Sequence, residues 1–303
     1  MRDREGRDLP PRAHIVCWGE LLWDLFPDGE RLGGSSANVA YHVAALGGTA
    51  RLVSRVGCDE RGERARQRLT EAGVDTKLVQ VDGERPTGTV RIDLHEGEPR
   101  FCIVQQTAWD QIECSEAVST ALARADALVF GTLAQRTPVG FGALRHAVTR
   151  LPKHCVRLCD INIRPPHLDR AVVDAALEAA DVVKLNESEA EALRALFGVP
   201  DAERFLLEQR GIRLVALTRG DAGCRLSTRE AAVEHPGFPL EDPSVGDRVG
   251  AGDAFVAVLA IGLVRGAPLE ALARRANRYA GHVASRPGAM PPVPPGLLVE
   301  LDR

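Results

Sequence analysis

The sequence has no excess of basic charge, no long apolar run and no regular pattern of cysteines. A formal net charge of −4 over 303 residues gives no reason to expect a nucleic acid or an anionic membrane as a partner. No apolar run reaches the roughly 18–20 residues of a membrane-spanning helix. Residues 1–12 are charged and proline-containing, unlike a signal peptide, so we expect a disordered tail there.

The cysteines are scattered, and their odd number argues against a disulfide framework. Cys155 and Cys159 lack the close pairing that is typical of a zinc site. Most of the cysteines fall in apolar, strand-like runs, where we expect buried, reduced thiols and hence a cytoplasmic protein. The seven positions are Cys17, Cys58, Cys102, Cys114, Cys155, Cys159 and Cys224.

What remains is an ordinary globular composition, with 45% hydrophobic and 26% charged residues. Strand-like and helix-like segments alternate over most of the length, which predicts an α/β fold with a largely parallel sheet and helices on both faces. The expected strands are residues 14–18, 50–56, 127–130, 156–161, 182–185 and 214–218. The expected helices are residues 37–46, 60–72, 115–125, 141–150, 171–179, 187–196, 202–210, 253–264 and 269–284.

One region breaks this alternation. Residues 89–95 carry apolar side chains at every second position, a turn-like segment follows, and residues 100–105 continue as a second strand. An antiparallel hairpin inserted early in an α/β domain is a candidate lid. We therefore expect one domain over residues 13–303, with a small β-lid from about 76–107 and a further segment of it near 22–33.

The most informative stretch is Asp-Arg-Val-Gly-Ala-Gly-Asp-Ala-Phe at residues 247–255, which runs into an apolar segment. Gly250, Ala251 and Gly252 have little or no side chain, so a ligand can approach their backbone closely. Small residues at a helix start present free N–H groups and the positive end of the helix dipole, which suits phosphate. A carboxylate such as that of Asp253 repels an anion and would weaken a site that only binds phosphate. We therefore interpret Asp253 as a base beside a developing phosphoryl charge. The motif predicts phosphoryl transfer to a hydroxyl.

Other interpretations of the same stretch stay open or fit less well. A glycine-rich loop before a helix is also typical of a tight turn in which Asp253 caps the helix. A Walker loop requires G-x-x-x-x-G-K-[ST], and the stretch contains no lysine. The dinucleotide-binding fingerprint G-x-G-x-x-G would need a glycine at the position of Phe255.

A second polar cluster follows the first expected strand. A carboxylate, an amide and bare glycine backbone suit a polyol, whose hydroxyl groups need donors and acceptors together. Ser35 and Ser36 in the same cluster are more typical of a helix cap. For the carboxylate and the amide, a purely structural role stays open. The candidate substrate-binding residues are Asp24, Gly33, Gly34 and Asn38.

Three further signals follow expected strands in the second half of the chain. The guanidinium of Arg164 matches phosphate oxygens in shape, although a surface arginine is the alternative. Asn186 and Glu189 can lie on one helix face and suit a water-coordinated Mg²⁺, but their spacing is also that of a capping box. A glycine turn after residues 214–218 suits nucleotide phosphates or a simple hairpin. Its candidate residues are Thr218, Gly220 and Gly223.

The order of these motifs resembles the ribokinase-like (PfkB) family of sugar kinases and, within it, the fructokinases. The resemblance covers about residues 14–295. It rests on residues 33–38 with 46–47, 186–189, 218–223 and 250–253, and for the fructokinase branch on 19–24 and 160–166. The resemblance implies a ribokinase-like three-layer αβα sandwich with a mostly parallel central sheet and a small β-lid.

The resemblance also implies a role for each candidate residue. Asp253 would take the proton of the sugar hydroxyl, and the backbone N–H groups of residues 250–252 would form an anion hole. The polyol cluster would bind the sugar, with Arg164 near the reacting hydroxyl. Asn186 and Glu189 would organise Mg²⁺ and its waters, and the glycine turn would contact ATP.

One position departs from the family pattern. Members of the family often use a monovalent cation near the anion hole, and Asp247 matches an acidic position of that loop, with residues 285–289 resembling its second half. The family usually has threonine where this chain has Arg248. A long cation there could reach phosphate or displace the monovalent ion, so K⁺ dependence stays open.

The sequence thus predicts a kinase that uses ATP and Mg²⁺ to phosphorylate a primary hydroxyl of a small sugar. Fructose is the favoured substrate. The alternatives are the same chemistry on ribose, a nucleoside or 2-keto-3-deoxygluconate, whose carboxylate Arg91 or Arg100 could bind. A non-catalytic sugar or nucleotide sensor is an alternative of another class, against which the intact Asp253 argues. An NAD-dependent oxidoreductase is disfavoured because its fingerprint is missing. A two-stranded hairpin is marginal alone, so we also expect a homodimer through the lid.

Overall fold

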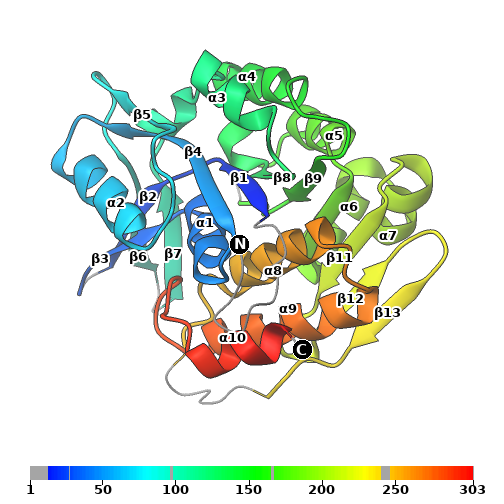
Figure 1. The fold of residues 1–303 in the computed structure, drawn as a ribbon. Coiled ribbons are helices and arrows are strands. Elements are labelled where there is room, and N and C mark those ends of the chain that lie inside the picture. Colours follow the sequence, from blue (N-terminus) through cyan, green and yellow to red (C-terminus); the bar gives the residue numbers. More distant parts are fainter. Residues whose placement is uncertain (1–12, 27, 96–97, 165–166, 240–245, 303) are drawn as a thin grey trace.

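The chain folds around one large, mostly parallel sheet with helices on both faces, and a second, smaller sheet stands beside it (Figure 1). The computed structural model describes residues 13–302 except 27, 96–97, 165–166 and 240–245. The expected tail at 1–12, the centre of the expected lid turn and the two prolines after Arg164 lie outside the described residues.

Nine of the described strands form the large sheet, in the order β13-β12-β11-β10-β9-β8-β1-β4-β5. Neighbours from β11 to β5 are parallel, and β12 and β13 are antiparallel at one edge. The strands are β1 (His14–Trp18), β4 (Thr49–Gly57), β5 (Val79–Asp82), β8 (Ala127–Gly131), β9 (Val156–Asp160), β10 (Val182–Asn186), β11 (Leu214–Thr218), β12 (Cys224–Ser227) and β13 (Ala232–His235).

Both faces of this sheet are covered, so its strands are apolar on both sides. In β1, Ile15 and Cys17 pack into one hydrophobic cluster, and Val16 and Trp18 into the other. Helices α1, α2, α8, α9 and α10 contribute to the first cluster, and α3 to α7 to the second. The helices are α1 (Ser35–Ala45), α2 (Glu60–Glu71), α3 (Glu116–Leu122), α4 (Pro138–Val148), α5 (Arg170–Ala179), α6 (Glu187–Phe197), α7 (Ala202–Arg204), α8 (Ala251–Val264), α9 (Leu269–Ala284) and α10 (Pro295–Asp302).

The second sheet, called the small sheet below, has the strand order β3-β2-β6-β7. Its strands are β2 (Leu22–Phe26), β3 (Gly29–Gly33), β6 (Gly88–His95) and β7 (Glu98–Ile103). It contains the expected hairpin and the expected extra segment. However, β5, which opens the expected 76–107 region, pairs in parallel with β4 in the large sheet, where Val79 is buried in the first cluster. The small sheet therefore takes up the hairpin part from Gly88 onward.

All six expected strands of the large sheet are present, with ends that differ by at most one residue. The expected helix at 202–210 is divided into α7 and a π-helical turn, Phe205–Gln209. The simple hairpin that the glycine turn allowed is present, because β12 pairs antiparallel with β11. Strand β13 and helix α10 were not anticipated, because β13 is short and partly polar and α10 follows a proline-rich stretch.

The described helices include none that is both long and apolar enough to cross a membrane. All seven cysteines are free thiols, and four of them are buried, as their apolar surroundings predicted. The buried ones are Cys17, Cys155, Cys159 and Cys224.

The parallel strands of the large sheet share one carboxyl-terminal edge. The chain order reverses at β1, which pairs with β4 on one side and β8 on the other. Open α/β sheets bind ligands at such a switch point, beyond the carboxyl ends of the strands. The N-terminus of α8 meets the residues that follow the strands at this edge, which is where the candidate residues gather.

Candidate active site

Asp253 lies in the first turn of α8, but its carboxylate is held by α1. Ser35 Oγ donates to Asp253 Oδ1 over 2.6 Å, and Asn38 Nδ2 donates to Asp253 Oδ2 over 2.8 Å. The cap residue of α8 is Gly250, so the alternative in which Asp253 caps its own helix is wrong. The Asp253 carboxylate thus connects the glycine-loop motif with the motif at residues 33–38, more than 200 residues earlier in the chain.

The helix-cap interpretation of the two serines is also wrong. Helix α1 begins after Gly34 without a side-chain cap. Ser36 Oγ donates instead to the Trp18 carbonyl over 2.9 Å, which ties α1 to β1. Ser35 donates a hydrogen bond to the candidate base. Its place in the sequence beside Gly34 and Asn38 could have suggested this role.

The environment of Asp253 is that of a general base. Burial is the largest influence and raises the pKa of Asp253 to about 6, against the lowering effect of the hydrogen bonds from Ser35 and Asn38. The Asp160 carboxylate raises this pKa further, and the Lys184 ammonium lowers it. A carboxylate with this pKa is ionised at neutral pH yet still basic enough to accept a proton in a transition state.

The backbone before Asp253 carries almost no side-chain atoms and is closely approached by neighbouring residues. Gly250 has φ +78°, and a Cβ there would lie 2.7 Å from the Cα of Ala289. A Cβ on Gly252 would lie 3.3 Å from the Nζ of Lys184. The N–H groups of the first helical turn have no acceptor within α8. The structure thus places Gly250, Ala251 and Gly252 at the positive end of a buried helix.

The polyol cluster lies at the junction of β1, β2 and α1. A Cβ on Gly33 would collide with Asp24 Oδ2, so this glycine makes room for the carboxylate. Gly34 has φ +103°, and a Cβ there would collide with the Glu20 carbonyl. Burial raises the pKa of Asp24 to about 6, although two arginines lower it. Both glycines are therefore required by close contacts that bring Asp24 and α1 together.

Arg164 follows β9 and is exposed. The His167 N–H donates to the Arg164 carbonyl over 2.8 Å, which fixes the backbone of this loop. The charge of Arg164 lowers the pKa of Asp24 and of Glu20, so the guanidinium lies near both acids. Glu20 is buried, and burial raises its pKa. The sequence analysis did not single out Glu20, although it is part of the segment 19–24.

Asn186 and Glu189 form a capping box at the start of α6. Asn186 Oδ1 accepts the Glu189 N–H over 2.8 Å, and Glu189 Oε2 accepts the Asn186 N–H over 2.8 Å. The structural alternative that the spacing allowed is therefore present. Glu189 is 4% exposed, and burial raises its pKa against the lowering effect of Lys184. The Asp160 carboxylate raises the pKa of Glu189 further, so Glu189 lies near the charges at the sheet edge.

Thr218 ends β11 and pairs in register with Asn186 at the end of β10. Gly220, with φ +56°, opens a short 3-10 turn, and a Cβ there would meet open space. A Cβ on Gly223 would collide with the His235 carbonyl, so the hairpin β12–β13 alone requires this glycine. Thr218 and Gly220 lie beside Asn186 at the edge, whereas Gly223 is explained by packing.

Asp247 and Arg248 precede the glycine loop and face different ways. Asp247 Oδ1 accepts the Val249 N–H over 3.1 Å, and Asp247 Oδ2 accepts the Gly288 N–H over 2.8 Å. Arg31 of the small sheet lies 3.8 Å from Asp247 Oδ2. Arg248 points to the hairpin turn and donates to Asp221 over 2.8 Å. Asp247 therefore links the loop to residues 285–289, and Arg248 links it to the turn after β11.

A second charged residue at this edge, after Glu20, was not predicted from the sequence. Lys184 is the third residue of β10 and pairs with Asp160 over 3.0 Å, with both side chains buried. A lysine between apolar residues of a buried strand was the available signal, because a cation is costly there without a partner.

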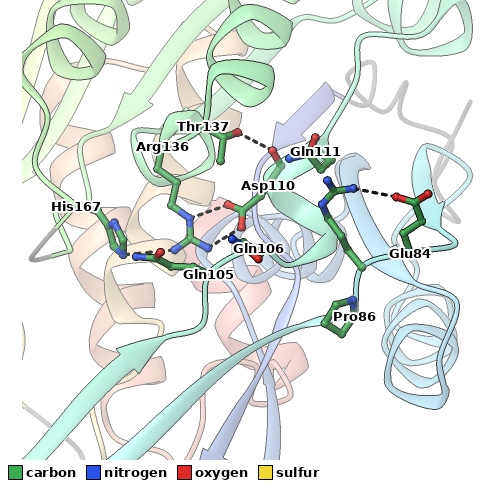
Figure 2. Close-up of a pocket in the computed structure, with 10 residues that line it drawn as sticks. Glu84, Pro86, Gln105, Gln106, Asp110, Gln111, Arg136, Thr137 and His167 are labelled. Atoms are coloured by element: carbon green, nitrogen blue, oxygen red, sulfur yellow. Dashed lines mark hydrogen bonds and ion pairs between the residues drawn. The ribbon is translucent and has the colours of Figure 1, made fainter.

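A polar pocket of ≈ 690 Å³ opens where the small sheet joins the rest of the chain (Figure 2). Arg136 donates to both carboxylate oxygens of Asp110 over 2.7 and 2.9 Å and to the Val104 carbonyl over 2.8 Å. Its guanidinium also lies 4.1 Å from the centre of the Trp109 ring. The described residues that line the pocket include none of the predicted site residues. Arg136 thus anchors the end of β7 to the core.

Comparisons with known proteins agree with this geometry. The sequence pattern described as "pfkB family carbohydrate kinase" matches residues 15–295. The fructokinase of Klebsiella pneumoniae is 33% identical over 263 residues, which cover 82% of this chain and 84% of that protein. The fructokinase of Escherichia coli is 32% identical over 281 residues, which cover 83% and 84%.

Solved structures show the same fold. A fructokinase from Vibrio cholerae O395, with fructose, ADP and calcium bound, matches with a TM-score of 0.77 at 26% identity and covers 95% of this chain and 98% of its own. A fructokinase from Xylella fastidiosa with bound ATP matches with a TM-score of 0.84 at 24% identity and covers 95% and 97%. The predicted ribokinase-like αβα fold is confirmed. The chain belongs to the pfkB family of carbohydrate kinases.

Proposed function

We propose that this kinase transfers the γ-phosphoryl group of ATP to a primary hydroxyl of fructose, with Asp253 as the base. The observation that carries the proposal is the buried Asp253 carboxylate at the N-terminus of α8, held by Ser35 and Asn38. An acid beside bare helix N–H groups serves proton removal next to a phosphoryl group, and little else.

The proposed step is an in-line displacement. The sugar oxygen attacks the γ-phosphorus while the bond from phosphorus to the bridging oxygen breaks, and ADP leaves with that oxygen. The hydroxyl proton passes to Asp253. Each carboxylate oxygen of Asp253 already accepts one hydrogen bond, and each retains a lone pair for this proton. The N–H groups of Gly250, Ala251 and Gly252 at the N-terminus of α8 stabilise the charge on the transferring group.

The acceptor side holds and shields the sugar. Asp24 and Asn38 supply an acceptor and a mixed donor and acceptor for the hydroxyl groups, and the bare backbone of Gly33 and Gly34 admits the ring. Arg164 balances the charge of Asp24 and lies where the sugar and phosphate meet. The small sheet acts as a lid over this side, which excludes water and limits hydrolysis of ATP.

The nucleotide side lies at the ends of β10 and β11. Thr218 and Gly220 contact the nucleotide, beside Asn186, while Gly223 shapes the turn that carries them. Among the described residues, no group of three His, Cys, Asp or Glu side chains could hold a metal ion directly. Mg²⁺ keeps several waters and binds mainly through phosphates. Glu189 would hold those waters, and Mg²⁺ would neutralise charge on the phosphates.

The monovalent cation is a separate question. Each oxygen of Asp247 accepts a backbone N–H, so this carboxylate already has a structural function without a cation. The guanidinium of Arg248 is bound to Asp221 and is not paired with Asp247. Assays in K⁺ and in a non-coordinating organic cation decide the point: K⁺ stimulation assigns Asp247 to a cation site, and its lack assigns Asp247 to the loop alone.

Fructose is the proposed acceptor because relatives named fructokinase match over most of the chain and the sequences of segments 19–24 and 160–166 resemble those of fructokinases. The test is ADP release from MgATP with fructose, ribose, 2-keto-3-deoxygluconate and a nucleoside. We expect the largest kcat/KM for fructose. A larger value for another acceptor would replace the substrate and keep the mechanism. ATP binding without turnover on any acceptor would favour the sensor.

A homodimer through the small sheet and a cytoplasmic location complete the proposal. β3 and β7 are the edge strands of the small sheet, so each can pair with another chain. Light scattering at micromolar protein is expected to give the mass of a dimer, and a monomer would contradict it. The cytoplasmic location stays a prediction. Microscopy of a tagged chain in its native cell tests it.

A further inference from the structure

One charged group at the sheet edge has no place in the mechanism so far. Lys184 is 5% exposed, and its Nζ lies 3.0 Å from Asp160 Oδ1. The chain has three lysines against 35 arginines, and Lys77 and Lys153 are exposed. A chain that uses arginine almost everywhere retains a lysine at its most buried cationic position. An ammonium is compact and spherical, whereas a guanidinium needs a planar space.

The charges around Lys184 do not cancel. Burial has the largest influence and lowers the pKa of Lys184, whereas Asp160 in β9, Glu189 in α6 and Asp253 in α8 all raise it. One ammonium thus faces three carboxylates from three different elements. A pair that existed only for structure would be neutral, because each unbalanced buried charge costs free energy.

Lys184 also has spare hydrogen-bond donors. An ammonium carries three N–H groups, and among the described residues its one hydrogen-bond partner is Asp160. The Nζ lies 3.3 Å from the point where a Cβ of Gly252 would be, so it borders the bare backbone of the proposed anion hole. Two donors of a buried cation are therefore left beside the place where phosphate charge would enter.

We propose that Lys184 is a further catalytic residue: its ammonium, held by Asp160 against Gly252, donates to the phosphoryl group that the N–H groups of residues 250–252 receive. This inference rests on the proposed function of the same site. It also fits Gly252, because a Cβ there would crowd the ammonium at 3.3 Å. Asp160 is then a positioning residue, which acts through Lys184.

The alternative is a purely structural ion pair, and a double substitution separates the two. K184M leaves Asp160 buried without a partner, so its effect on activity would mix folding and chemistry. K184M/D160N removes both charges and restores a neutral, well-packed pair. The control is K77M, which removes an exposed lysine. The readouts are melting temperature, kcat, and the dissociation constants of AMP-PNP and ADP.

We expect K184M/D160N to melt near the wild type and to lose at least ~10²-fold in kcat, the size of effect seen when one donor to a transition-state anion is removed. Affinity for AMP-PNP should fall at least about tenfold more than affinity for ADP, because Lys184 contacts the terminal phosphoryl group. A kcat within threefold of the wild type, or equal losses for AMP-PNP and ADP, would overturn the inference.

Two further arms keep the result decisive. If K184M/D160N does not fold, K184Q keeps a neutral hydrogen bond to Asp160 and is held to the same criteria. If the wild type phosphorylates no acceptor, the proposed function fails, while the comparison of AMP-PNP with ADP still tests Lys184 on its own.

Discussion

The two sides of the site are built in different ways. On the phosphoryl side, the start of α8 is fixed by the core: Asp253 is bound by α1, and Gly250 packs against Ala289. On the acceptor side, Asp24 lies on the small sheet and Arg164 on an exposed loop. Exposed loops such as the one that carries Arg164 change with little cost in stability, whereas packed helix starts do not. We therefore expect the residues that pack into the core to determine the phosphoryl transfer, and the residues of the small sheet and the exposed loop to determine which sugar binds.

Helix α1 fixes the phosphoryl side at a second point. His42, one turn after Asn38, has its Nε2 2.9 Å from the Ala289 carbonyl and its Nδ1 2.9 Å from the Tyr279 hydroxyl. A carbonyl only accepts, so Nε2 carries the proton and the Tyr279 hydroxyl donates to Nδ1. Burial lowers the pKa of His42 to about 3, so it stays neutral. Both Asp253 and the residue that packs on Gly250 are thus held by one helix.

The largest expected effect separates the two sides by their kinetic signatures. Asp253→Asn should lower kcat by at least ~10²-fold, because it removes the base and keeps the shape of the side chain. Asp24→Asn is the matched change on the acceptor side and should raise the KM for sugar about tenfold, since it removes one charged hydrogen bond. Steady-state kinetics with a nucleotide titration measure both. Near-wild-type turnover in Asp253→Asn would remove the base assignment.

Two glycines test the difference in packing. Gly250→Ala places a Cβ 2.7 Å from Ala289 in a backbone with φ +78°, so we expect a lower melting temperature and a roughly 10- to 10²-fold loss of kcat. Gly29 in the small sheet also has a positive φ, +141°, but a Cβ there meets nothing within 4 Å. Gly29→Ala should therefore cost stability through backbone strain alone and leave kcat nearly unchanged. Equal losses of kcat in Gly250→Ala and Gly29→Ala would contradict the proposed difference between the two sides.

Both sides of the site should respond to pH in the same range, because burial raises the pKa of Asp253 and of Asp24 to about 6. Below pH 6, kcat should fall about tenfold per pH unit as Asp253 gains a proton. Stability should move the other way. The folded-state pKa of Asp253 is raised from 3.8, so its contribution to stability is complete below pH 3.8 and is lost as pH rises through about 6. Asp253→Asn should flatten the Asp253 part of the stability change, which thermal melts from pH 4 to 7 measure.

The same contrast explains what could be predicted from the sequence. The strands of the large sheet were found almost to the residue, because buried strands are continuously apolar. The glycine loop was found because its constraints are local. Ser35 was misassigned to a cap, since its partner Asp253 is 218 residues away. Lys184 was missed because a single charge in an apolar strand has meaning only once Asp160 and Gly252 are placed beside it.

The smallest expected effect comes from an ion pair that joins the small sheet to the loop before α8. Arg31 of β3 lies 3.8 Å from Asp247, and both side chains are partly exposed. Such pairs contribute about 0.2–1 kcal/mol, so Arg31→Ala should change kcat/KM by less than about fivefold. Arg31 also pairs with Asp28 within the small sheet over 3.0 Å, so Asp28→Asn is the control that leaves the contact with Asp247 in place.

The salt dependence sharpens this last test. A solvent-exposed ion pair is screened at high ionic strength, so the difference between Arg31→Ala and the wild type should vanish near 1 M salt. A loss greater than about tenfold, insensitive to salt, would mean that Arg31 fixes the loop before Gly250 as firmly as α1 does. The small sheet would then belong to the catalytic core, and the division into a fixed phosphoryl side and a variable acceptor side would not hold.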